Sequence, residues 1–141
     1  MTDPNNNRSL VILNDYVCAG FPSPADDYAE TGIDLNELLV SHPASTFFIR
    51  VKGESMVGAR IQDGDVIMVD RSLEPIDGNV ILALLNGEFI VKRYKKKGSN
   101  IQLIPEYETP HSTQCGGAIT VAREDNFEVW GVVSYIIHKS K

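Results

Sequence analysis

The sequence predicts a mostly β domain that follows a long, irregular N-terminal arm. Short apolar runs recur through the C-terminal part and are separated by turns rich in Gly and Asp, which is typical of strands. The dipeptide Asn86-Gly87 stands between two such runs and is the strongest short-range hairpin signal. Nearer the N-terminus, Gly20, Pro22 and Pro24 fall within five positions. Proline removes a backbone donor and fixes φ, so this stretch is excluded from a helix interior or a central strand.

Each element within this outline has its own signal. Residues 1–9 are polar and expected to be disordered, and residues 10–33 are expected to form an exposed, extended and irregular arm. Asp34 is the expected N-cap of a short helix, because Glu37 follows three residues later, and Pro43 should end that helix. The three lysines at 95–97 are expected to form a solvated turn with no catalytic role. Strands are expected at residues 47–51, 66–69, 80–85, 88–94, 101–104, 118–122 and 127–137.

Composition limits the classes of function. The 141 residues fit one domain with a net charge of −6, and an acidic surface argues against unaided binding to nucleic acid, which draws on clustered Lys and Arg. The longest apolar run, residues 80–85, is six residues, whereas a membrane span needs about 20. The run at residues 10–13 is shorter than the roughly 7–15 residues of a signal-peptide core. Two cysteines, Cys18 and Cys115, fit a reducing compartment, so we expect a cytoplasmic protein.

A serine after a glycine turn is the first candidate for chemistry. Gly53-Glu54-Ser55-Met56 lies just past a predicted strand, and glycine lets the backbone turn sharply. Such a turn can expose the Ser55 hydroxyl together with the backbone N–H groups of residues 54–56, which could stabilise an oxyanion. On turn statistics alone, an ordinary turn serine is the more common explanation.

Lys92 gains meaning from the register of the predicted hairpin. A two-residue turn at 86–87 pairs Ile81 with Lys92, and directly opposite residues share a face of the sheet. The face of Lys92 then carries the aliphatic side chains of Ile81, Ala83 and Leu85. Desolvation there would lower the lysine pKa, and a neutral lysine can take a proton from a serine. The alternative is an edge-strand lysine that reaches out to water.

Several motifs occur together in a characteristic order: residues 19–28, 33–39, 42–43, 51–56, 63–65, 87–92, 102–105 and 130–133. Through them the chain, from about residue 17 to its C-terminus, resembles the LexA/UmuD family of self-cleaving serine–lysine peptidases. The resemblance implies a compact, strongly bent, LexA C-terminal-like β fold that pairs as a homodimer. It further implies a flexible arm at residues 1–33 that carries a cleavage site, and a peptidase and dimerisation domain at residues 34–141.

The resemblance also implies the chemistry. The nucleophile of the family falls on Ser55 and its lysine on Lys92, with no cofactor and no metal. The expected cleavage site is the Ala19–Gly20 bond. UmuD-like proteins usually carry cysteine directly before this glycine, whereas here Cys18 lies one position earlier, and Ala–Gly is the pair common in LexA-type repressors. A small residue followed by glycine lets the backbone approach the nucleophile closely.

Partners are implied by the same resemblance. In the family, a RecA filament on single-stranded DNA stimulates self-cleavage, and the processed dimer joins a UmuC-like Y-family polymerase in translesion synthesis. The 19 residues before the expected cut do not accommodate a helix-turn-helix domain, so the chain resembles the UmuD-like SOS mutagenesis proteins and not the repressors. We therefore expect neither sequence-specific DNA binding nor a membrane partner.

Three other classes of function are alternatives to this interpretation. The first is a non-catalytic, dimeric interaction module that regulates a polymerase, against which the intact Ser55 and Lys92 argue. The second is a signal peptidase, which would need a membrane anchor. The third is a cysteine–histidine enzyme, for which no local signature exists. The residues of such an enzyme would be Cys18 or Cys115 with His42, His111 or His138. A metal site is not indicated either, because these residues do not show metal-ligand spacing.

Overall fold

The computed structural model describes residues 10–13, 17, 19–20, 30–108 and 117–141. These divide after Ser41 into an N-terminal unit and a C-terminal unit. The boundary lies beyond the 33/34 boundary expected from the sequence, so the short helix groups with the arm. The expected disorder of residues 1–9, the two prolines at 22 and 24, and both cysteines lie outside the described residues.

The N-terminal unit contains regular structure that the sequence patterns did not predict. Strands β1 (Leu10–Leu13) and β2 (Glu30–Ile33) form a two-stranded antiparallel sheet. The expectation of an irregular arm is therefore wrong at both ends of the 10–33 stretch, because pairing satisfies the backbone groups of the apolar run. Helix α1 (Leu35–Leu39) begins as predicted, with the Asp34 carboxylate accepting a hydrogen bond from the Asn36 N–H at 2.9 Å. It ends four residues before Pro43, which instead opens the 3-10 helix η1 (Pro43–Ser45).

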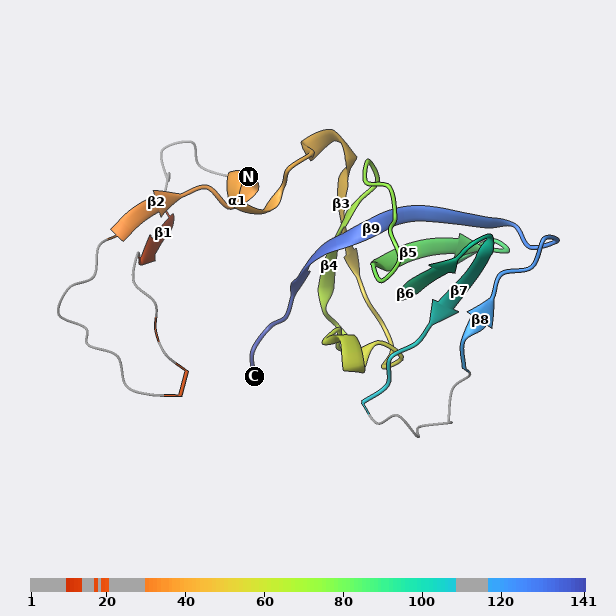
Figure 1. The fold of residues 1–141 in the computed structure, drawn as a ribbon. Helices are drawn as coiled ribbons and strands as arrows, with labels where there is room; N and C mark the ends of the chain where they lie inside the picture. The colour runs from red at the N-terminus through yellow and green to blue at the C-terminus, as the bar shows by residue number, and fades with distance from the viewer. Residues whose placement is uncertain (1–9, 14–16, 18, 21–29, 109–116) are drawn as a thin grey trace. The chain divides into compact units, whose positions relative to one another are not determined.

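The C-terminal unit is one antiparallel sheet of seven strands in the order β3-β4-β9-β5-β6-β7-β8 (Figure 1). This confirms the mostly β fold. A second 3-10 helix, η2 (Val57–Ala59), lies in the connection from β3 to β4. The strands are β3 (Thr46–Arg50), β4 (Val66–Asp70), β5 (Val80–Leu85), β6 (Glu88–Lys97), β7 (Asn100–Ile104), β8 (Ile119–Thr120) and β9 (Phe127–Ile137).

Two of these strands differ from the predicted bounds by more than one residue at an end or in length, while β3, β4 and β7 differ by a single residue. β6 continues through the three lysines at 95–97 and pairs with β7, so these residues are an exposed strand and not a turn. The turn falls just beyond them, at Gly98, whose φ of 62° suits glycine. β8 is limited to Ile119 and Thr120, two residues of the predicted five, although the Val121 N–H also donates to the Ile101 carbonyl oxygen of β7 at 3.0 Å.

Strand β9 bends the sheet. It lies between β4 and β5, and Figure 1 shows it as a long, curved strand across the unit. Its register shifts once against each neighbour, so that Ser134 has no counterpart on β4 and Trp130 has none on β5. An extra residue of this kind is a β-bulge, which bends a strand and increases its twist. The two bulges account for the curvature of β9 in Figure 1.

The sheet buries apolar side chains on both of its faces. Ile81 and Leu82 are neighbours on β5 and therefore point to opposite faces, and both are almost fully buried. Leu82 belongs to a first core cluster with Met56, Ile61, Ile67 and Val69. Ile81 belongs to a second core cluster with Ala83, Tyr94, Leu103 and Val132.

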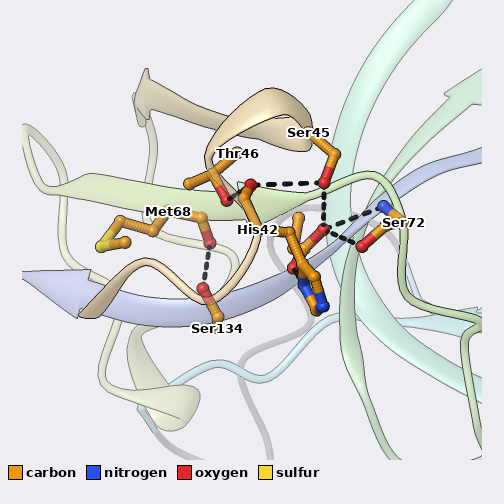
Figure 2. A network of polar contacts seen from close by, with 7 residues as sticks. His42, Ser45, Thr46, Met68, Ser72 and Ser134 are labelled. Atoms are coloured by element: carbon orange, nitrogen blue, oxygen red, sulfur yellow. Dashed lines mark hydrogen bonds and ion pairs between the residues drawn. The ribbon is translucent and has the colours of Figure 1, made fainter. Parts of the chain in front are cut away.

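A polar network fixes the end of β4 (Figure 2). The buried Asp70 carboxylate lies 2.6 Å from His42 Nδ1 and accepts hydrogen bonds from the hydroxyl groups of Ser45 and Ser72. These contacts hold the pKa of Asp70 far below its usual value despite burial, which alone would raise it. At the other end of β4, Asp65 contacts His138 in the same way at 2.6 Å. Both ends of this buried strand are thus anchored by a carboxylate.

Gly131 generates a prediction about packing at the bulge. A Cβ there would lie 2.4 Å from Val69 Cγ1 and 3.2 Å from the Asp70 carbonyl oxygen. Gly131→Ala should therefore lower the free energy of unfolding by about 1–3 kcal/mol through overpacking. Gly117→Ala is the control, because nothing lies within 4 Å of its added Cβ. Urea unfolding checks this, and equal stability of the two variants would contradict it.

Candidate functional site

Ser55 lies in a tight turn between β3 and η2. Gly53 has a φ of 103°, a conformation that favours glycine, and its N–H donates to the Asp63 carboxylate at 2.7 Å. Met56, directly after the serine, is buried in the first core cluster. The turn is therefore fixed on both sides. The sharp turn at Gly53 is as the sequence predicts, but Ser55 itself is half-buried.

Lys92 lies where the hairpin register predicts. It pairs with Ile81 across β5 and β6, and the turn at 86–87 has positive φ at both residues, as a two-residue hairpin requires. Its face of the sheet carries the buried side chains of Ile81, Ala83 and Tyr94, all members of the second core cluster.

The fold brings the two side chains together. Lys92 Nζ lies 2.8 Å from Ser55 Oγ in a half-buried position, although the residues are 37 positions apart. Burial lowers the pKa of the Lys92 ammonium, and no charged neighbour contributes to that shift. Loss of a proton from Nζ lets the same contact reverse, so that the Ser55 hydroxyl donates to a neutral amine. The arrangement can activate a serine without a histidine or a carboxylate.

Backbone donors surround the serine. In the part of the chain that the structure describes, the N–H groups of Glu54, Ser55 and Met56 donate no hydrogen bond. The carbonyl oxygens of Glu54 and Ser55, by contrast, are both occupied, by Val57 N–H at 3.3 Å and Glu106 N–H at 2.7 Å. Free N–H groups beside a nucleophile are the donors that an oxyanion needs.

Ala19 and Gly20 lie in the N-terminal unit and are exposed. Among the described residues, nothing lies within 4 Å of a Cβ built on Gly20. Cys18 lies outside the described residues.

Of the remaining sequence candidates, the structure describes only His42 and His138. His42 and His138 each contact a buried aspartate at 2.6 Å and serve to anchor β4. His111 and Cys115 lie outside the described residues. Among the residues that are described, no three His, Cys, Asp or Glu side chains are grouped as metal ligands. Nor does any described helix have the length and hydropathy of a membrane span.

Sequence reasoning missed the residues that hold the serine turn from the other side. Glu106 receives and donates backbone hydrogen bonds there, and its side chain pairs with Arg93. Gly58 lies against this segment so closely that an added Cβ would be 2.6 Å from the Tyr107 carbonyl oxygen. The sequence feature that could have indicated the position of Glu106 is Pro105, which directly follows β7 and so directs residue 106 out of the sheet.

Comparisons with known proteins place this chain in a family. Residues 11–134 match the family model described as Peptidase S24-like, and the chain therefore belongs to this peptidase family. The resemblance to the LexA/UmuD family is thereby confirmed, and with it the mostly β, LexA C-terminal-like fold.

The relatives agree with this assignment. The chain is 39% identical to Protein ImpA of Salmonella typhimurium over 141 residues, which cover 99% of the chain and 92% of that protein. It is 38% identical to Protein MucA of Escherichia coli over 130 residues, covering 91% and 84%. It is also 38% identical to the LexA repressor of Aeromonas hydrophila over 106 residues, but these cover 75% of the chain and only 50% of the repressor. The chain is therefore UmuD-like, similar over nearly its whole length to ImpA and MucA.

Burial of Lys92 generates a prediction about stability. Since its pKa is lowered in the folded protein, the unfolded chain binds more protons than the folded one between the two pKa values, and stability rises with pH in that window. Lys92→Met removes this penalty. In a Ser55→Ala background that cannot cleave, it should raise the free energy of unfolding at neutral pH, and the advantage should shrink as the pH approaches about 10.4.

Urea unfolding across a pH series measures this effect. The control is Lys97→Met, which changes an exposed lysine at the far end of the same strand. Equal pH dependence of the two variants would show that Lys92 is not a desolvated amine.

Proposed function

We propose that the protein is an autocatalytic serine endopeptidase in which Ser55 is the nucleophile, Lys92 the general base, and the Ala19–Gly20 bond the substrate. The observation that carries the proposal is the 2.8 Å contact between Lys92 Nζ and Ser55 Oγ in a chain of a peptidase family. The burial that lowers the lysine pKa supports the same assignment. A base of this kind is suited to work without a third group.

The first step is acylation. Neutral Lys92 takes the Ser55 hydroxyl proton while Oγ attacks the carbonyl carbon of Ala19. The N–H groups of residues 54–56 stabilise the resulting oxyanion. The intermediate collapses, the Ala19–Gly20 C–N bond breaks, and the Lys92 ammonium returns the proton to the leaving Gly20 amine. An ester between Ala19 and Ser55 remains.

The second step is hydrolysis of that ester. Lys92 takes a proton from water, the hydroxide attacks the Ala19 carbonyl carbon, and the ester bond breaks. Ser55 Oγ regains its proton from Lys92, which returns to the neutral form. The chain is shortened at its N-terminus, and no cofactor enters either step.

The biological setting follows from the family resemblance. We propose a UmuD-like SOS regulator in the cytoplasm, whose self-cleavage is stimulated by a RecA filament on single-stranded DNA. The processed chain would pair as a homodimer and support error-prone translesion synthesis with a UmuC-like Y-family polymerase. The similarity to ImpA and MucA over nearly the whole chain supports this setting.

The nucleophile assignment makes a direct prediction. Ser55→Ala should lower the rate of self-cleavage roughly 10³-fold or more, because the attacking atom is gone, and should leave the fold intact. Mass spectrometry of intact protein after incubation at alkaline pH, or with RecA on single-stranded DNA, reports both the cut bond and the rate. Ser99→Ala, in the exposed turn between β6 and β7, is the matched control. Cleavage of the Ser55→Ala protein at the parent rate would refute the assignment, and a parent that never cleaves would favour an interaction module.

The base assignment makes a second prediction, about pH. Burial lowers the pKa of Lys92 from the ordinary value of about 10.4, and only the neutral amine can act as a base, so unstimulated cleavage should rise with pH from a slow rate at neutral pH. The rate should level off above the folded pKa of the lysine. Lys92→Arg should be inactive throughout, since a guanidinium does not lose its proton in proteins. A parent rate that stays flat from about pH 7 to about pH 10 would contradict the role of Lys92.

A further inference from the structure

A half-buried ion pair lies beside the proposed dyad. Arg93 directly follows Lys92 on β6, and its guanidinium donates to both carboxylate oxygens of Glu106, at 2.6 Å from Nε and 2.9 Å from Nη2. A third donor, Nη1, reaches the Gly78 carbonyl oxygen at 3.0 Å. The side chains are 27% and 30% exposed, and paired geometry of this kind is stronger and more directional than a surface contact.

The backbone of Glu106 holds the serine turn. Its N–H donates to the Ser55 carbonyl oxygen at 2.7 Å, and its own carbonyl oxygen accepts from the Gly58 N–H at 2.7 Å. Residue 106 therefore bonds to the chain on both sides of Met56, which is buried in the core. The space is filled, because a Cβ on Gly58 would lie 3.0 Å from the Glu106 carbonyl oxygen.

We propose that the Arg93–Glu106 ion pair positions the Ser55 hydroxyl against Lys92. Neither member of the pair touches the reacting atoms, so both are positioning residues. The pair joins the residue next to the base to the residue that holds the backbone of the nucleophile. This inference rests on the function proposed above and adds to it the device that sets the distance within the dyad.

The electrostatics fit a positioning role. The hydrogen bond from Arg93, its charge and the charge of Lys95 hold the pKa of the Glu106 carboxyl below its ordinary value, against the effect of burial. The pair is therefore charged throughout the neutral and alkaline range in which Lys92 loses its proton. Loss of the ion pair should therefore disturb the position of the Ser55 hydroxyl relative to Lys92. It should not change the pH at which Lys92 becomes active as a base.

The test is Glu106→Gln, with self-cleavage followed across alkaline pH at a temperature where circular dichroism shows every variant folded. The plateau rate of self-cleavage should fall roughly 10- to 100-fold, because a displacement of about 1 Å between two reacting groups has a cost of this size. The midpoint of the rate–pH profile should stay unchanged. Glu106→Asp keeps the carboxylate and should recover part of the rate. The matched control is Glu128→Gln, which removes the carboxylate of the more exposed Arg71–Glu128 pair, at 3.7 Å, and should cleave at the parent rate.

A second measurement does not depend on cleavage. In the Ser55→Ala background, Glu106→Gln should speed amide hydrogen exchange at Gly58 and Glu106, the two donors of the turn. A parent plateau rate with unchanged exchange would overturn the inference, and so would a moved midpoint at an unchanged plateau, which would mean an electrostatic role. If the parent itself does not cleave, the proposed function fails, and the exchange rates alone decide whether the ion pair holds the turn.

Discussion

The pairing of Ile81 with Lys92 across the β5–β6 hairpin is the constraint on which the candidate site depends. It places the lysine amine on a face of buried apolar side chains, where its charged form is disfavoured, and within 2.8 Å of the serine hydroxyl. The side-chain period of a strand is two, so a slip of one residue would turn Lys92 to the opposite face. The turn at 86–87 excludes that slip, since its length and positive φ angles fix the register.

The serine reaches the lysine because the sheet is bent and its connections pack against it. Bulges at Trp130 and Ser134 bend β9, which pairs with both β4 and β5. The connection from β3 to β4 carries Ser55 and inserts Met56 into the first core cluster. The segment after β7 meets this connection at Glu106, and Arg93 links that segment back to β6. Strand register, core packing and an ion pair thus together define the small region that contains Ser55 and Lys92.

Local signals in the sequence predicted the parts of this arrangement that depend on near neighbours. The Asn86-Gly87 turn was enough to predict the hairpin, its register and the face of Lys92. The proximity of Ser55 and Lys92 required the family resemblance, because it depends on tertiary packing over 37 positions. The pairing of β1 with β2 was missed because a proline-containing stretch separates the two strands. The role of Glu106 was missed because its partners lie on two other segments.

The carboxylates at the two ends of β4 have a practical consequence for preparing the protein. Against the effect of burial, hydrogen bonds from the Gln62 N–H and from His138 lower the pKa of Asp65. Contacts with Ser72, His42 and Ser45 lower the pKa of Asp70 in the same way. The stability that these two carboxylates contribute is therefore lost only as the pH falls through the lowered values. Lys92, the proposed base, is protonated and inactive once the pH falls below its own pKa, which happens at a higher pH than the protonation of the two aspartates. A mildly acidic buffer at about pH 6 stays above the lowered aspartate pKa values and above the sequence pI of about 5.0, and it favours the protonated form of Lys92. Purification in such a buffer would preserve the uncleaved chain with its own serine in place.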